Sequence, residues 1–234
     1  MRPSIIIALL FLSACWTQQE QKGNRILPHT TKQINRETPK FVLTRANNCT
    51  QTKLSKQFDI SIDFKQYTDS AEKLDSCSLK VFIKNKSTGL LIDSLSLTSF
   101  TYYFKTFSSC DSATSYTTHF KSNRRIVDND FGDIVVADLN FDGDDDIAVV
   151  NDCLSSSGPT YSYFMQTNRQ QFALDKFLTD SVSFFPSKIN VKNKTLTTYI
   201  LAGACGIGEH IYQFDKKTNT WKQKRHTLIN VCKN

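Results

Sequence analysis

The sequence has few of the residues that build common active sites. Of its 234 residues only four are histidine, and neither a G-x-S-x-G nucleophile motif nor an H-E-x-x-H zinc motif occurs. Its seven cysteines include no C-x-x-C pair, which argues against a zinc ribbon and against thioredoxin-like redox chemistry. A hydrolase would need paired carboxylates across a cleft or a nucleophile with a base. The acidic residues instead concentrate in one loop, so we predict that the chain is not an enzyme.

Long apolar runs are also missing, and the apolar run near the N-terminus is short. Residues 5–12 are about half the length that a membrane-spanning helix needs. Arg2 precedes this run and Leu12-Ser13-Ala14-Cys15 follows it, so small residues stand directly before a cysteine. This pattern resembles the lipobox of bacterial lipoproteins, in which the cysteine is diacylated and becomes the mature N-terminus. An ordinary cleaved signal peptide is the alternative.

Lipidation of Cys15 implies a location in the cell envelope. Two or more acyl chains anchor a protein stably, whereas one chain does so only marginally. The residue after the cysteine is Trp16, not the aspartate that resembles an inner-membrane retention signal. We therefore expect a periplasmic lipoprotein anchored in the outer membrane, and the leaflet or face, including the cell surface, stays open.

The net charge of +7 does not by itself indicate an anionic partner. Residues 16–45 carry six lysines and arginines against Glu20 and Glu37, a net +4, and residues 46–234 carry only +2. The 16–45 stretch has no apolar periodicity, which is typical of a flexible tether. We predict a signal peptide at 1–14, a lipidated tether at 15–45 and one domain at 46–234. Nothing in the sequence favours nucleic-acid binding.

Six cysteines remain once Cys15 is set aside. An even number in an exported chain is typical of structural disulfides, here up to three, and fifteen pairings are open. The six are Cys49, Cys77, Cys110, Cys153, Cys205 and Cys232.

The domain is predicted to be all-β. Residues 58–64 alternate strictly between apolar and polar, the period of a half-buried strand. Residues 79–83 and 90–97 flank a polar, glycine-ended segment at 85–89 that is typical of a hairpin turn. Further short apolar segments lie at 134–137, 147–150, 161–165, 195–201 and 210–214, and only 70–76 suggests a short helix. A sandwich, a barrel or a propeller-like antiparallel array would fit this pattern.

One loop, residues 138–146, has the spacing of a calcium site. Alternate residues of a tight D-x-N-x-D-G-x-x-D loop can direct oxygens at one centre, and calcium takes six to eight oxygen ligands. Gly143 permits the sharp turn, and the backbone carbonyl of Asp144 can supply another oxygen. The predicted ligands are Asp138, Asn140, Asp142, Asp144 and Asp146.

The loop differs from an EF-hand, because Val149 stands where the bidentate glutamate would be. It resembles the strand-loop-strand calcium sites of integrin-type propellers. An ordinary acidic turn is the alternative, since surface turns favour aspartate, asparagine and glycine. Five aspartates within nine residues repel one another unless a cation compensates them, and magnesium demands a smaller octahedral cage. We therefore expect one structural calcium ion.

A longer pattern surrounds this loop. Residues 135–143 are followed by Tyr161-Ser162-Tyr163-Phe164, by Val191 to Leu196, and by the glycine-rich segment at 202–214. This order resembles a family of bacterial periplasmic lipoproteins with an N-F-D-G calcium loop. The resemblance implies a truncated β-propeller-like fold. It also implies an immunity protein that inhibits peptidoglycan hydrolases delivered by antibacterial type IV secretion systems. It covers residues 131–226, and the extra cysteines and the acidic Asp144-Asp145 pair depart from it.

The glycine-rich segment is the candidate contact with such a hydrolase. Three glycines allow a protruding turn, and Gly206, Glu209 and His210 would offer backbone and polar contacts at its tip. The alternative is a β-turn in which Cys205 is disulfide-bonded and His210 begins the next strand.

Two non-enzymatic functions compete. The first is inhibition of a cell-wall hydrolase by a membrane-anchored lipoprotein. The second is a calcium-stabilised lipoprotein that binds glycans or a surface, with aromatics such as Tyr199 and Trp221 stacked on sugars, although Trp221 is more typical of a core position. The oligomeric state is left open.

Overall fold

The computed structural model describes residues 41–69, 75–99, 113–115, 134–154, 158–168 and 171–232. The predicted signal peptide, Cys15 and residues 15–40 of the tether lie outside these ranges. Within them, no helix has the length and apolar character needed to cross a membrane.

The described residues form three sheets, which are antiparallel except where β5 runs parallel to β6. The first sheet contains β1 (Phe41–Gln51), β2 (Phe58–Asp69), β3 (Asp75–Asn85) and β4 (Leu91–Ser99). The second contains β5 (Ala113–Ser115), β6 (Ile134–Ala137), β7 (Asp146–Leu154), β8 (Gly158–Thr167) and β9 (Gln171–Leu174). The third contains β10 (Lys188–Asn190), β11 (Thr195–Leu201), β12 (Gly206–Asp215) and β13 (Thr220–Asn230). The prediction of an all-β antiparallel array is confirmed.

Alternation along the strands decides how the sheets pack. Phe58, Ile60, Ile62 and Phe64 of β2 are all buried, and the polar residues between them are only partly buried. Because successive side chains of a strand point to opposite faces, the first sheet has one apolar face. That face packs on one side of β6 and β7 in a single cluster that also includes Phe172 of β9.

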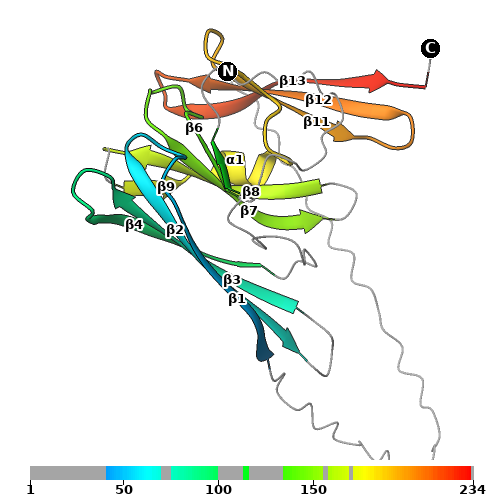
Figure 1. Ribbon diagram of the computed structural model, residues 1–234. Coiled ribbons are helices and arrows are strands. Elements are labelled where there is room, and N and C mark those ends of the chain that lie inside the picture. The colour runs from blue at the N-terminus through cyan, green and yellow to red at the C-terminus, as the bar shows by residue number, and fades with distance from the viewer. Residues whose placement is uncertain are drawn as a thin grey trace, which may run out of the picture. The chain divides into compact units, whose positions relative to one another are not determined.

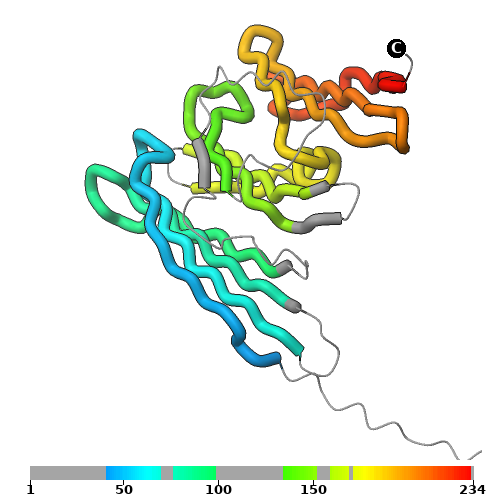
Figure 2. Tube along the Cα trace, turned by 45° about the vertical axis from the view of Figure 1, so that its right-hand side comes forward, coloured from blue at the N-terminus to red at the C-terminus, as the bar shows by residue number. Residues whose placement is uncertain are grey.

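The second sheet lies in the middle and is buried on both faces (Figures 1 and 2). Ile134 and Val136 of β6 join the cluster with the first sheet, whereas Val135 and Ala137 join a second cluster with the third sheet. A strand covered on both sides needs apolar residues at every position, which explains the continuous apolar run 134–137.

A short helix, α1 (Lys176–Ser181), belongs to the second cluster. Asp175 caps it by accepting a 2.8 Å hydrogen bond from the Leu178 N–H, and Leu178 is fully buried. The sequence did not predict this helix.

Two expected boundaries need correction. Strand β1 begins at Phe41, so the strand includes residues 41–45, which we expected in the tether. Asp75 and Ser76 belong to strand β3, not to the short helix expected at 70–76, whose other residues lie outside the described ranges. In both places pairing with β2 determines the conformation.

One disulfide joins Cys205, just before β12, to Cys232, just after β13. It ties together the ends of two strands that pair from Gly206–Asn230 to Asp215–Thr220. Cys49 is also disulfide-bonded. The structure thus confirms that cysteines crosslink the domain.

Candidate functional site

The loop 138–146 connects β6 to β7, and its first aspartate shapes the turn. The Asp138 carboxylate accepts hydrogen bonds from the Asp142 N–H and the Gly143 N–H, both at 3.1 Å. Gly143 has a φ of +97°, a conformation that L side chains rarely adopt. The glycine and the first aspartate therefore act together to fold the chain back on itself.

Asn140 and Asp142 lie on the same turn as Asp138. The Asn140 Oδ1 accepts a 3.0 Å bond from the Asp142 N–H, the same group that Asp138 contacts. The Asn140 Nδ2 donates to Asp142 Oδ2 at 2.9 Å, and Asp142 Oδ1 accepts from the Asp144 N–H at 2.9 Å. Loop positions 1, 3 and 5 are thus brought together, as the spacing predicts.

Asp146 has a different environment from the other loop aspartates. It is fully buried, and its carboxylate accepts bonds from the Leu139 N–H (2.8 Å), the Asn140 N–H (3.2 Å) and the Gln166 N–H (2.8 Å). Burial raises the pKa of Asp146 well above its usual range, and the three N–H donors oppose that rise. This side chain organises the loop and joins it to β8.

Asp144 and Asp145 connect the loop to the turn before β2. Gln57 Nε2 donates to Asp144 Oδ1 at 3.1 Å, and the Ser55 hydroxyl donates to Asp145 Oδ2 at 2.6 Å. The carboxylates of these two aspartates tie the first sheet to the second. Nothing in the sequence pointed to Ser55 or Gln57.

The chemistry of the loop fits a hard cation only in part. Among the described residues, no three His, Cys, Asp or Glu side chains gather in a group that could hold a metal ion. A cation here would therefore need the Asn140 oxygen and backbone carbonyls beside Asp138 and Asp142. Burial raises the pKa of Asp138, and the nearby charge of Asp142 raises it further, a repulsion that a bound cation would relieve. The oxygen-only donor set is the kind that calcium prefers.

The glycine-rich segment does not form a protruding tip. Residues from Gly206 onward belong to β12, which pairs with β11 on one side and with β13 on the other. Glu209 and His210 are neighbours in this strand, so their side chains point to opposite faces of the third sheet. Gly206, Glu209 and His210 therefore do not share a loop tip, and the structure agrees instead with the alternative in which Cys205 is disulfide-bonded and a strand follows the turn.

Close packing explains two of the glycines. A Cβ atom on Gly206 would collide with the backbone oxygen of Ala202. A Cβ atom on Gly208 would lie 2.9 Å from His210 Nε2 and 3.3 Å from His226 Nε2. The two imidazole rings stack with centroids 4.3 Å apart. These glycines allow close approach within the sheet.

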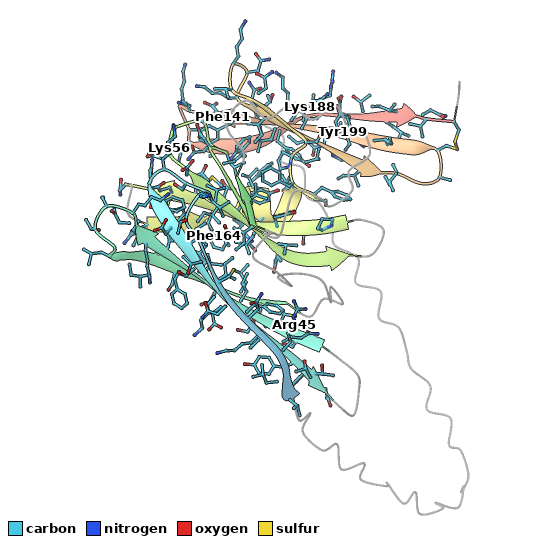
Figure 3. All side chains as sticks on the ribbon, in the orientation of Figure 1. Arg45, Lys56, Phe141, Phe164, Lys188 and Tyr199 are labelled. Atoms are coloured by element: carbon cyan, nitrogen blue, oxygen red, sulfur yellow. A yellow bond between two sulfur atoms is a disulfide. The ribbon has the colours of Figure 1, made fainter. Side chains whose placement is uncertain are left out.

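The two aromatics considered for stacking on sugars are buried. Trp221 packs against Phe141 and Phe214, with ring centroids 6.0 Å and 5.1 Å away, as its predicted core position requires. Tyr199 is 3% exposed, and the Lys188 ammonium lies over its ring, 5.1 Å from the centroid. Both residues lie on the third sheet (Figure 3). Neither ring is available to a saccharide in this structure.

The fold of this chain is similar to that of a known protein. No protein family and no curated protein matches the sequence. The fold is similar to a solved structure described as a Xanthomonas type IV secretion system related protein, with a TM-score of 0.53 and 16% sequence identity. The similarity covers 83% of this chain and 88% of the other. At this identity the likeness shows a shared fold.

Proposed function

We propose that this chain is a lipoprotein of the bacterial envelope that binds and inhibits a peptidoglycan hydrolase. The observation that carries the proposal is the fold, shared over most of both chains with a protein related to type IV secretion. The lipobox at Cys15 and the N-F-D-G loop agree with the resemblance to immunity lipoproteins. A protective inhibitor has to stand where the incoming hydrolase acts, and a lipid anchor with a tether would hold it there.

The calcium loop has a supporting role in this proposal. Asp138, Asn140 and Asp142 would hold the ion, with a backbone oxygen of Asp144. The ion would supply positive charge among five aspartates and so stabilise the junction between the first two sheets. Asp146 remains a predicted ligand whose three backbone hydrogen bonds already give it a structural task.

Inhibition is best tested with purified protein. The mature chain carrying Cys15→Ala, which removes the lipid, is mixed with peptidoglycan hydrolases that antibacterial type IV systems deliver, and clearing of a cell-wall suspension is followed. We expect at least one hydrolase to lose activity at about one inhibitor per enzyme, with a dissociation constant in the range of tight protein complexes, about 10⁻⁷ M or below.

A capture experiment distinguishes hydrolase binding from glycan binding. The same chain is immobilised and exposed to periplasmic and secreted fractions, with calcium or with chelator. Recovery of a hydrolase supports the proposal, whereas binding of glycan with no hydrolase recovered would favour the surface-binding alternative. Loss of membrane association on Cys15→Ala in cells tests the anchor separately.

A further inference from the structure

Positive charge is concentrated on the third sheet. Residues 188–230 contain eight lysines and arginines and only two acidic residues, Glu209 and Asp215, a net +6. The whole of residues 46–234 carries only +2, so the rest of the domain is net acidic. The small net charge of the domain therefore conceals a strongly basic sheet.

Strand register places part of this charge in one row. Thr197 of β11 pairs with Lys188 of β10 and with Ile211 of β12, and Ile211 pairs with Arg225 of β13. Because directly paired residues share a face, one row crosses all four strands. The adjacent row contains Tyr199 paired with Glu209.

A recess of about 350 Å³ opens over these rows. Among the residues that the structure describes, its charged lining consists of Lys188, Lys224 and Arg225 against the single carboxylate of Glu209. That carboxylate is already engaged, since Arg225 donates to one oxygen at 2.6 Å and the Tyr199 hydroxyl donates to the other at 3.0 Å. The recess therefore has an excess of positive charge.

The donors around the recess are held in place. Lys188 Nζ donates to the Tyr199 hydroxyl oxygen at 2.7 Å, and its ammonium carries three donors in all. Asn190 Oδ1 accepts from the Asn193 N–H at 3.0 Å, so the Asn190 amide can present its NH₂ group to a ligand. Thr197 adds a hydroxyl, and Ile211 adds a small apolar patch.

We infer that this recess binds a small ligand whose carboxylate is flanked by hydroxyl or amide groups. Ammonium and guanidinium donors make their strongest hydrogen bonds to such anions. The volume lies at the lower end of small-molecule pockets, about 300–1,000 Å³, which suits one acidic sugar or a short acidic peptide. The buried Tyr199 ring excludes recognition by stacking, so charge has to supply the affinity. The inference is independent of hydrolase inhibition, and either proposal can fail alone.

Defined probes identify the source of the carboxylate. The mature Cys15→Ala chain is titrated with N-acetylmuramic acid, with N-acetylglucosamine, with an N-acetylated Asp-Glu dipeptide and with inorganic phosphate, and amide resonances are followed by NMR. The two sugars differ by a carboxylate-bearing group. We expect one carboxylate probe to shift the Thr197 and Ile211 amides, and which one does so separates sugar from peptide. No shift with either, or equal binding of N-acetylglucosamine or phosphate, overturns the inference.

A pair of charge-matched variants locates the site. Lys188→Gln with Lys224→Gln removes two charges from the recess, and Lys216→Gln with Lys217→Gln removes two from the β12–β13 turn. We expect the first pair to weaken binding of the active probe by about tenfold and the second by less than about twofold. Equal losses of affinity in the two pairs of variants would indicate diffuse electrostatic attraction and contradict a specific site in the recess. If the Lys188 change unfolds the chain, Lys224→Gln alone, on an exposed residue, gives the same contrast with Lys217→Gln.

Discussion

The Ser55 hydroxyl donates a 2.6 Å hydrogen bond to Asp145 Oδ2, although 90 positions separate the two residues in the sequence. The Ser55 oxygen also accepts from the Gln57 N–H at 2.9 Å and from the Phe58 N–H at 3.3 Å. A single buried hydroxyl thus orders the turn before β2 and fastens it to the aspartate loop.

Ser55→Ala is expected to destabilise the domain by about 2 kcal/mol, because it leaves two backbone donors without their acceptor and removes a bond to a charged group. Urea denaturation monitored by circular dichroism gives the change in the free energy of unfolding. Thr50→Ala is the matched control, since its hydroxyl contacts Ser61 at an exposed position. Equal effects of the two changes would contradict the role given to Ser55.

Calcium should raise the melting temperature of the chain. At a free concentration about 100 times the dissociation constant, binding stabilises by about 2.7 kcal/mol, which corresponds to about 5–10 °C for a domain of this size. Differential scanning calorimetry with calcium and with EDTA measures the shift. Asp142→Ala should abolish it, and Asp180→Ala, at an exposed helix position, should preserve it. A melting temperature that EDTA leaves unmoved would refute the structural ion.

Trp221→Ala should cost about 3–5 kcal/mol of stability. The indole ring is 6% exposed and packs between Phe141 and Phe214, so its removal leaves a cavity in the cluster shared by the second and third sheets. The neighbouring Lys222 is exposed, and Lys222→Ala should change the free energy by less than about 0.5 kcal/mol. Chemical denaturation distinguishes the two, and a mild effect of Trp221→Ala would argue against this packing.

Replacing the Cys205–Cys232 disulfide should destabilise the folded state. The crosslink joins residues 27 positions apart, and closing a loop of this length stabilises by about 3–4 kcal/mol in the chain-entropy account. The double variant Cys205→Ala, Cys232→Ala is compared with the wild type under non-reducing conditions. Under reducing conditions the difference should shrink, and an undiminished difference would point to packing of the alanines instead.

The paired histidines predict a pH dependence of stability. Burial lowers the pKa of His210 below its usual 6.5, and the nearby charge of His226 lowers it further. The unfolded chain then binds more protons than the folded one as the pH falls. The contribution of His210 to stability is therefore present above about pH 6.5 and is lost as the pH falls through the lowered folded pKa.

Denaturant midpoints measured at about pH 7.5, 6.5 and 5.5 test this dependence. The denaturant midpoint should fall less between about pH 7.5 and about pH 5.5 in His210→Gln, which removes the titrating ring, and in His226→Gln, which removes the neighbouring charge. Gln223 Nε2 lies 3.5 Å from His210 Nδ1, and Gln223 is unchanged in both variants. Identical slopes in the wild type and in His210→Gln would show that His210 has no part in the effect.

Strands with a simple burial pattern could be predicted from the sequence. The apolar segments 134–137 and 195–201 coincide with β6 and β11, and the alternation in 58–64 marks β2. Strand β1 was not predicted, because its residues from Thr44 onward are mostly polar and half exposed, so its pairing with β2 leaves little trace in composition. Helix α1 spans only six residues and buries only Leu178, too short for a helical period to be visible.

Candidate sites were harder to predict because they depend on register. The loop 138–146 is continuous in the sequence, and its turn geometry could be foreseen from spacing. The glycines at 206 and 208 suggested a protruding turn, yet they allow close approach to Ala202 and to two imidazole rings. The recess combines residues from four strands, and only the pairing of Thr197 with both Lys188 and Ile211 brings them into one row.

The middle sheet separates the two apolar clusters, so the sequences of the two outer sheets can change without affecting a shared core. Side chains of the first sheet and of the third sheet meet opposite faces of β6 and β7, so substitutions in the two outer sheets affect different cores and should combine additively. The outer sheets are then free to diverge independently and to acquire new binding faces. The strands between them carry the constraints of both neighbours and leave the least room for variation.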